Sequence, residues 1–359
     1  MKHIFVINPH AGGENHAESL AKEIEALAVD SEIYLTTGHL DATRYVDQYC
    51  RAHPSEALRF YACGGDGTLN EVASGALPHP EAEMGCYPCG SGNDYVKYWP
   101  TADFRSLQAL VEAPAMPVDL MRVRFDGQER HCINLMNLGF EAAVCRSMEI
   151  VRGKPLVGGK MAYTSGIVHS LFYGRHHPCR IGVDGEAWHE GDMLLGSLAN
   201  GRYAGGGYCC APRSVNDDGL MEVMAVLPIS VARFVSVIDL YKKGQHLDST
   251  KMKDVVEYRR GRRVSIESDK PMWAALDGEL VCSNHLYRKP VPGHPLRRAA
   301  EIEKGPATVR QAGPCLICLL VYSFNCTCSI RSWDSSCNRC CRPVCCRSRG
   351  TPRRSRCRP

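Results

Sequence analysis

The stretch Cys63-Gly64-Gly65-Asp66-Gly67-Thr68-Leu69-Asn70-Glu71-Val72 follows an apolar run, 58–62, and opens an amphipathic run, 69–77. This order predicts a buried strand, a tight glycine turn and the first turn of a helix. The glycines permit positive φ angles and leave room for a bulky anion, which the N–H groups of the helix N-terminus would bind. Asp66 would repel a phosphate unless a cation lay between them, so the loop predicts a phosphate site with Mg²⁺. A glycine-rich turn without a ligand is the alternative interpretation of this pattern alone.

The order of strand, glycine loop and helix repeats along residues 1–117. Apolar runs predict strands at 4–7, 32–36, 58–62 and 84–88, and helical spacing predicts helices between them and at 104–112. Glycine loops follow three of the strands, at 8–13, 64–68 and 90–94. The alternation predicts a doubly wound parallel α/β domain whose ligand site lies at the carboxyl ends of its strands.

From residue 118 to about 284 the pattern changes to short runs rich in β-formers, separated by Asp, Gly, Pro and Asn. These runs predict a second, mainly antiparallel domain with helical segments around 162–173 and 231–241. Two turns, 216–220 and 276–279, carry pairs of carboxylates, and each pattern, taken alone, more often marks only a solvated hairpin turn. The glycine-rich stretch 200–207 predicts close backbone approach to a ligand or to the first domain.

Charge and cysteine divide the chain unevenly. Residues 285–359 carry 15 Lys and Arg against 3 Asp and Glu, whereas residues 1–284 carry 28 against 36. Ten of the 20 cysteines lie in 315–359, and the others are scattered. Scattered cysteines without a secretory segment predict a cytoplasmic protein, and no apolar run reaches the ~18 residues of a transmembrane helix. Cys86-x-x-Cys89 has the spacing of zinc ligands or a redox pair, but we expect it only to line the adjacent loop.

Five motifs together resemble the diacylglycerol/sphingosine-type lipid kinase family, in its bacterial branch, from residue 3 to about 282. They are Asn8-Pro9 with Gly12-Gly13, the 64–71 loop, Gly90-Ser91-Gly92-Asn93-Asp94, the 216–220 turn and the 276–279 turn. The resemblance implies a nucleotide-binding α/β domain, a β-sandwich-like second domain and an active site between them. It also implies phosphoryl transfer from Mg-ATP to a lipid hydroxyl such as that of a diacylglycerol.

The resemblance carries site residues over to this chain. ATP would be held by Asn8, by Thr36, by the run Gly65, Asp66, Gly67, Thr68, Leu69, Asn70 and Glu71, and by Ser91, where a threonine is more usual. A structural Mg²⁺ would be held by Asp218 and the carbonyls of Val215 and Leu220, with Asp119 as its partner in an aspartate–water network. Glu279 would be the base that accepts the hydroxyl proton. Asp277 would project to the same side of an extended segment and hold water or a cation.

Other functions stay open. A kinase that acts on NAD shares the Gly-Gly-Asp-Gly-Thr loop, although no dinucleotide-binding segment is evident. A non-catalytic nucleotide-binding protein is the third possibility. We expect peripheral contact with a membrane that holds the lipid substrate and no nucleic-acid partner, and the chain could form a homodimer.

The range 285–359 departs from the family, whose members end in further strands, one of which returns to the first domain. Here the segment mixes Cys, Arg, Ser and Pro without alternation or helical faces, apart from an apolar run at 315–324. We therefore expect an atypical, largely disordered tail, in which an out-of-frame or otherwise unselected sequence has replaced the native C-terminus. A basic or metal-binding arm is the alternative.

Overall fold

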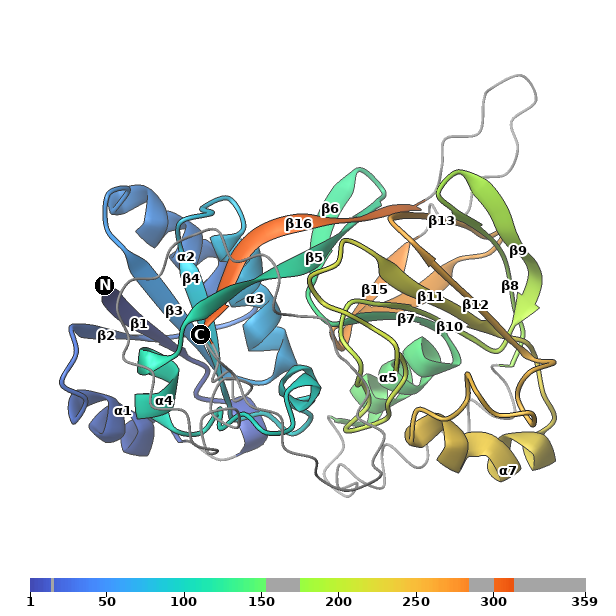
Figure 1. The fold of residues 1–359 in the computed structure, drawn as a ribbon, viewed down its shortest axis with the longest axis horizontal. Helices are drawn as coiled ribbons and strands as arrows, with labels where there is room; N and C mark the ends of the chain where they lie inside the picture. The colour runs from blue at the N-terminus through green and yellow to red at the C-terminus, as the bar shows by residue number, and fades with distance from the viewer. Residues whose placement is uncertain (14–15, 153–174, 284–299, 313–359) are drawn as a thin grey trace, which may run out of the picture. The chain divides into compact units, whose positions relative to one another are not determined.

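The computed structural model describes residues 1–13, 16–152, 175–283 and 300–312 (Figure 1). All of them belong to one unit of contacting residues. Among these residues, no helix combines the length and apolar character needed to cross a membrane.

Four parallel strands with helices between them form the first half of the chain. In spatial order the strands are β2 (Ser31–Leu35), β1 (Lys2–Ile7), β3 (Leu58–Gly64) and β4 (Glu83–Pro88). The helices are η1 (Ala11–Gly13), α1 (Ala17–Glu25), α2 (Asp41–Ala52), α3 (Asp66–Ala76), η2 (Tyr95–Tyr98) and α4 (Leu107–Glu112). Every residue of β3 is buried, as expected for a parallel strand covered on both faces. The predicted doubly wound α/β domain is therefore confirmed.

The second half is built from antiparallel strands in two sheets. The parallel sheet continues into β5 (Ala115–Phe125), β6 (Gln128–Cys132), β8 (His177–Val183), β9 (Glu186–Met193) and β13 (Arg263–Glu267). The other sheet has the order β12 (Val256–Gly261), β11 (Met221–Val226), β10 (Leu195–Ala199), β7 (Leu135–Gly139), β14 (Met272–Leu276) and β15 (Glu279–Ser283). Apolar side chains of both sheets share one core, which confirms the predicted antiparallel β domain.

Two helices accompany the second sheet. The helix α7 (Val231–Lys242) lies where a helix was predicted, whereas the helix predicted at 162–173 lies outside the described residues. The helix α5 (Phe140–Arg152) was not predicted. Side chains of α5, α7, β10 and β11 form a further apolar cluster.

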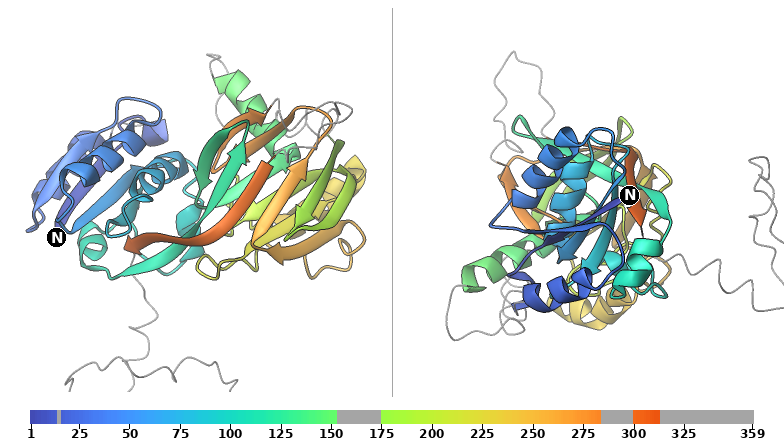
Figure 2. Two further views of the ribbon diagram at one scale, coloured as in Figure 1. Left: turned by 90° about the horizontal axis from the view of Figure 1, so that it is seen from above. Right: turned by 90° about the vertical axis from the view of Figure 1, so that its left-hand side faces the viewer.

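Strand β16 (Ala300–Ala312) joins the two halves. Its C-terminal end pairs in parallel with β4 through Arg310 and Gln311, and it pairs antiparallel with β5 and β13. Figure 2 shows β16 running beside β5 along its length. The expectation that 285–359 supplies no returning strand is therefore wrong for residues 300–312. The strand is specified by backbone pairing to partners far away in sequence, which side-chain alternation did not reveal. Residues 284–299 and 313–359 lie outside the described residues, and their predicted disorder and origin stay predictions.

Candidate functional site

The glycine loop 64–68 lies where three parallel strands end. The amide of Asn8, after β1, donates to the carbonyl of Cys63 at 2.9 Å, and the amide of Cys89, after β4, donates to the carbonyl of Gly64 at 2.8 Å. Asn8 Nδ2 also donates to Thr68 Oγ1 at 3.2 Å. The three predicted loops therefore meet at the carboxyl ends of the strands.

Gly64 and Gly65 of this loop are constrained by space, whereas a Cβ atom on Gly67 would make only an ordinary contact. None of Gly64, Gly65 and Gly67 has a positive φ, and Gly65 has a φ of −93°. A Cβ atom on Gly65 would lie 3.3 Å from the Cα atom of Gly90, and one on Gly90 would overlap Gly65. The two loops thus approach with their backbones in contact, which only glycine permits.

Asp66 holds the second loop. Its carboxylate accepts hydrogen bonds from the amides of Asp94 at 3.1 Å and Tyr95 at 3.0 Å. Burial raises the pKa of Asp66, and these two bonds oppose the shift. The two amide groups therefore stabilise the carboxylate of Asp66. This structural role explains an aspartate at position 66 without a bound cation. The predicted contact of Asp66 with a nucleotide stays a prediction.

Glu71 fixes the loop that follows β2. Its carboxylate oxygens accept from the amides of Leu40 at 2.9 Å and Ala42 at 3.1 Å, at the start of α2. A carboxylate at a helix N-terminus is favoured by the free N–H groups and the dipole. The loop it holds carries Thr36, which is buried, and its backbone is set by a left-handed Leu40. Ser91, by contrast, is exposed in the second glycine loop.

Asp277 connects the second half of the chain to α3. Asp277 (φ 48°) and Gly278 (φ 90°) form the two-residue turn between β14 and β15. The expectation that Asp277 and Glu279 lie on one side of an extended segment is wrong, because the chain reverses between them. The carboxylate of Asp277 is buried and accepts from five donors at 2.6–3.1 Å, namely the amides of Ile133, Asn134 and Leu135, the thiol of Cys132 and Nδ2 of Asn70.

We expect Asp277→Asn to lower the free energy of unfolding by about 2 kcal/mol, because an amide group in this pocket leaves buried N–H donors without an acceptor. Asparagine tolerates the left-handed backbone, so the turn itself should survive. Asp126→Asn is the matched control, since Asp126 has a φ of 52° in an exposed Asp-Gly hairpin. Urea unfolding of the two variants measures the difference, and equal midpoints would contradict the assigned role.

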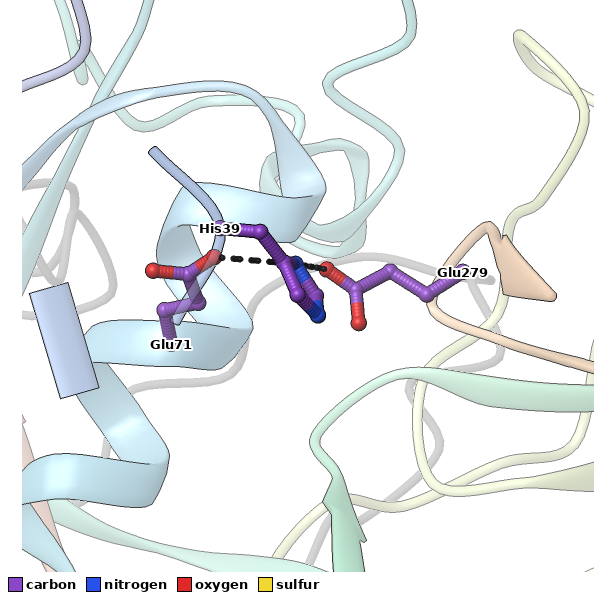
Figure 3. Close-up of side chains that lie close together, drawn as sticks. All are labelled: His39, Glu71 and Glu279. Atoms are coloured by element: carbon purple, nitrogen blue, oxygen red, sulfur yellow. Dashed lines mark ion pairs between the residues drawn. The ribbon is translucent and has the colours of Figure 1, made fainter. Parts of the chain in front are cut away.

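Glu279 reaches the first half of the chain from the start of β15. Its Oε1 lies 3.6 Å from Nδ1 of His39, and the same nitrogen lies 3.6 Å from Oε1 of Glu71 (Figure 3). A Cβ atom on Gly67 would lie 3.7 Å from Oε1 of Glu279. Burial raises the pKa of Glu279, His39 and Arg130 lower it, and Glu71 and Asp277 add to the rise. The carboxylate thus stands beside the first turn of α3 with a strengthened affinity for a proton.

The structure also brings together the predicted metal residues. Asp119 Oδ2 accepts from the amide of Gly219 at 2.7 Å, and the amide of Asp119 donates to Asn216 O at 2.7 Å. The carboxylate of Asp218 is paired with the guanidinium of Arg260, and its Oδ1 accepts from the amide of Leu220 at 3.0 Å. Asp218 therefore already has a cation, and a metal there would have to displace it. The predicted Mg²⁺ site of Val215, Asp218, Leu220 and Asp119 does not fit this arrangement of side chains.

Asp94 and the glycine-rich stretch 200–207 form a second connection between the halves. Asp94 Oδ2 accepts from the amide of Gly206 at 2.8 Å, and its Oδ1 pairs with Lys97 at 2.5 Å. The guanidinium of Arg202 lies 4.6 Å from the ring centre of Tyr98. The glycine-rich stretch therefore approaches the first half, one of its two predicted alternatives.

His39 was missed from the sequence, and Asp94 was part of the 90–94 motif but was given no role of its own. Both follow a parallel strand on the side where its carboxyl end lies, and that position was the available signal. In the described part of the chain, His39, Glu71 and Glu279 are the one group of His, Cys, Asp and Glu side chains spaced to hold a metal ion. Cys86 and Cys89 are free thiols outside that group.

Comparisons with known proteins place the chain in a family. Residues 2–123 match the diacylglycerol kinase catalytic domain, and residues 134–294 match the YegS C-terminal NAD kinase beta sandwich-like domain. A protein of Xanthomonas euvesicatoria named "Probable lipid kinase YegS-like" is 32% identical over 276 residues, which are 74% of this chain and 85% of that protein. A protein of the same name from Stenotrophomonas maltophilia is 28% identical over 300 residues, 80% of this chain and 93% of that protein.

A solved structure of a diacylglycerol kinase from Bacillus anthracis has the same fold. It superposes with a TM-score of 0.58 at 18% identity, covering 87% of this chain and 96% of that one. Both domains match their families in the order seen here, and the curated relatives align across both. The chain therefore belongs to the diacylglycerol kinase family, in the branch of the YegS-like lipid kinases.

Proposed function

We propose that the protein transfers the γ-phosphoryl group of Mg-ATP to the hydroxyl of a diacylglycerol-like lipid at a membrane surface, with Glu279 as the base. The observation that carries this proposal is the position of Glu279 beside Gly67, at the N-terminus of α3. A kinase needs an acceptor for the hydroxyl proton and donors for the charge of the transferred group at one place. These two groups come from segments more than 200 residues apart.

The glycine loop would bind the phosphates. The first N–H groups of a helix have no partner within the helix and favour an anion. The 11-residue helix α3 begins directly after Gly65, where the backbones of Gly65 and Gly90 meet. The Mg²⁺ that accompanies ATP would neutralise part of the phosphate charge when bound. Asn70, held by Asp277 at 2.6 Å, keeps α3 in register with the turn that carries Glu279.

A lipid acceptor is supported by an apolar cavity in the second half of the chain. The cavity lies among α5, α7, β10 and β11 and is partly open to solvent. Its lining includes Ala204 and Gly205, next to Gly206, whose amide bonds Asp94 in the second glycine loop. A chain in this cavity could therefore leave its head group near the glycine loops.

The test is transfer of label from γ-labelled ATP to lipid in mixed micelles, with NAD as the competing acceptor. We expect label in diacylglycerol, and we expect its loss when EDTA removes Mg²⁺. Label only in the dinucleotide would identify the NAD-directed alternative, and ATP binding without transfer would identify a non-catalytic protein. Either result would overturn the proposal.

Gly90→Ala should weaken ATP binding at least about tenfold, because the new methyl group forces the two glycine loops apart at a cost of about 1–3 kcal/mol. Gly38→Ala is the matched control, since a Cβ atom there meets nothing within 4 Å and the residue lies in the neighbouring loop after β2. Equilibrium dialysis with labelled ATP measures both. Unchanged affinity in the Gly90 variant would remove the loop from the binding site.

A further inference from the structure

The cavity among α5, α7, β10 and β11 contains one ionisable carboxyl group, Glu141. Its other described lining residues include no Lys, Arg or His that could compensate a negative charge. Most of the wall is aliphatic or aromatic, as in Phe140, Val144, Leu195, Phe234, Val237 and Met252. A carboxyl group in such a wall needs a reason, because burial of a charge without a counter-ion is costly.

Only one oxygen of Glu141 is used within the described structure. Oε1 accepts from the hydroxyl of Tyr241 at 2.9 Å. The thiol of Cys210 lies 3.8 Å from Oε1 but only 3.4 Å from the carbonyl of Tyr208, its other acceptor. Oε2 is buried and has no hydrogen-bond partner among the described residues. Burial raises the pKa of Glu141 to about 7. A neutral carboxyl in this place has its proton on Oε2, because the hydroxyl of Tyr241 donates to Oε1.

The cavity approaches the site from which phosphate would be transferred. Asn137 of its lining pairs across the sheet with Ala275, two residues before Asp277. At Ala204 and Gly205 it adjoins the amide that bonds Asp94. Glu141 is the second residue of α5, whose first residue, Phe140, follows directly after β7. If the lipid head group lies at the glycine loops, the part of the lipid chains nearest the head group would therefore lie beside Glu141.

We propose that Glu141 recognises an acyl ester of a glycerolipid bound in the cavity. The neutral carboxyl group of Glu141 donates a hydrogen bond from Oε2 to the carbonyl oxygen of that ester. This proposal rests on the proposed function for the identity of the ligand as a lipid. An ester carbonyl supplies the missing acceptor, whereas an ether oxygen is a weak one. A long-chain amine would instead bring a cation and require the ionised carboxylate.

The experiment measures lipid binding without ATP, so that it does not depend on phosphoryl transfer. Labelled 1,2-dioctanoylglycerol and its diether analogue, 1,2-dioctylglycerol, are compared by equilibrium dialysis. We expect wild type to bind the ester about fivefold more tightly than the ether, the value of one ordinary hydrogen bond. Glu141→Leu should lose that preference, and Glu141→Gln should keep it because its amide group still donates. Circular dichroism and urea unfolding verify that both variants fold.

Equal binding of ester and ether by wild type would overturn the assignment, and so would a preference that survives in Glu141→Leu. Tighter binding of a long-chain amine, lost in Glu141→Leu, would overturn it in favour of a carboxylate that binds a cation. Ester preference in a protein that transfers no phosphate would support this assignment while contradicting the proposed function. The two hypotheses can thus fail separately.

The pH dependence of lipid binding by the wild-type protein is a second test. The ester preference should fall as pH rises from about 6 to 8, because the carboxyl group loses the proton that it donates. Tyr241 and Cys210 face Glu141, and burial raises the pKa of each well above its ordinary value, so neither ionises in this range. His246 lies against Tyr241, and burial lowers its pKa to about 4, so it stays neutral. Cys145 and Tyr208 line the same cavity. Glu141→Gln should show no such dependence.

Discussion

Replacement of Glu279 by Gln is expected to lower the rate of lipid phosphorylation by about 10²- to 10⁴-fold, the usual contribution of a general base. Glutamine has the same shape as glutamate but cannot accept the hydroxyl proton. The effect should appear in kcat with little change in ATP affinity, because Glu279 stands beside the glycine loop without forming it. Steady-state kinetics with γ-labelled ATP and micellar diacylglycerol measure it.

The chain provides a matched control for this variant. Asp184-Gly185-Glu186 is a second Asp-Gly-Glu hairpin, with the same two positive φ values at its turn, 55° and 91°. Glu186 lies at the surface and pairs with Arg259 at 2.7 Å. Glu186→Gln should therefore leave kcat unchanged. Loss of activity in both variants, or in neither, would remove Glu279 from the reaction.

The pH dependence of the phosphorylation rate of the wild type should reflect the ionisation of Glu279. A base acts in its ionised form, and burial holds the pKa of Glu279 above that of an ordinary glutamate. The rate should therefore fall on acidification at a higher pH than an exposed carboxylate would give. Removal of His39, whose nearness lowers this pKa, should move the acidic limb further toward neutral pH.

Replacement of Arg260 by Met is expected to destabilise the fold by about 3–5 kcal/mol, the usual effect of leaving a buried charge without its partner. Glu222 is 1% exposed and stands opposite Arg260 in the pairing of β11 with β12. Arg260 Nε lies 2.8 Å from Oε1 of Glu222, and the guanidinium also contacts Asp218. Loss of Arg260 would leave the charge of Glu222 buried in the sheet without its counter-ion.

Urea unfolding measures this prediction against two further variants. Arg259→Met removes a surface pair with Glu186 and should cost at most about 1 kcal/mol. Glu222→Leu combined with Arg260→Met removes both charges of the pair, including the buried one of Glu222, and should recover most of the loss. A double variant as unstable as Arg260→Met alone would show that Arg260 acts through Asp218 and not through Glu222.

Much of the first half of the protein can be predicted from the sequence, because its elements are specified by local patterns. The apolar run before Cys63, the glycines after it and the helical spacing from Leu69 place β3, the loop and α3 without tertiary information. Parallel order then brings the loops at Asn8, Gly64 and Gly90 to one edge of the sheet.

The sequence alone could not predict features that depend on distant partners. Nothing local reveals that residues 300–312 pair with β4, β5 and β13. Asp277 was expected to hold water or a cation, but its surroundings come from Asn70 and from residues 132–135. His39 reaches Glu279 only because Glu71 holds the loop after β2.

The two Asp-Gly-Glu hairpins show what the local sequence determines and what only the tertiary structure determines. Their sequence determines the same tight turn twice, because Asp and Gly tolerate the positive φ angles that such a turn needs. The tertiary structure alone separates them. The hairpin of β8 and β9 leaves Glu186 at the surface, whereas that of β14 and β15 is held to α3 by Asp277 and directs Glu279 to the glycine loop. Backbone preferences act within a few residues, but the position of a carboxylate beside a helix N-terminus depends on contacts between segments far apart in the chain.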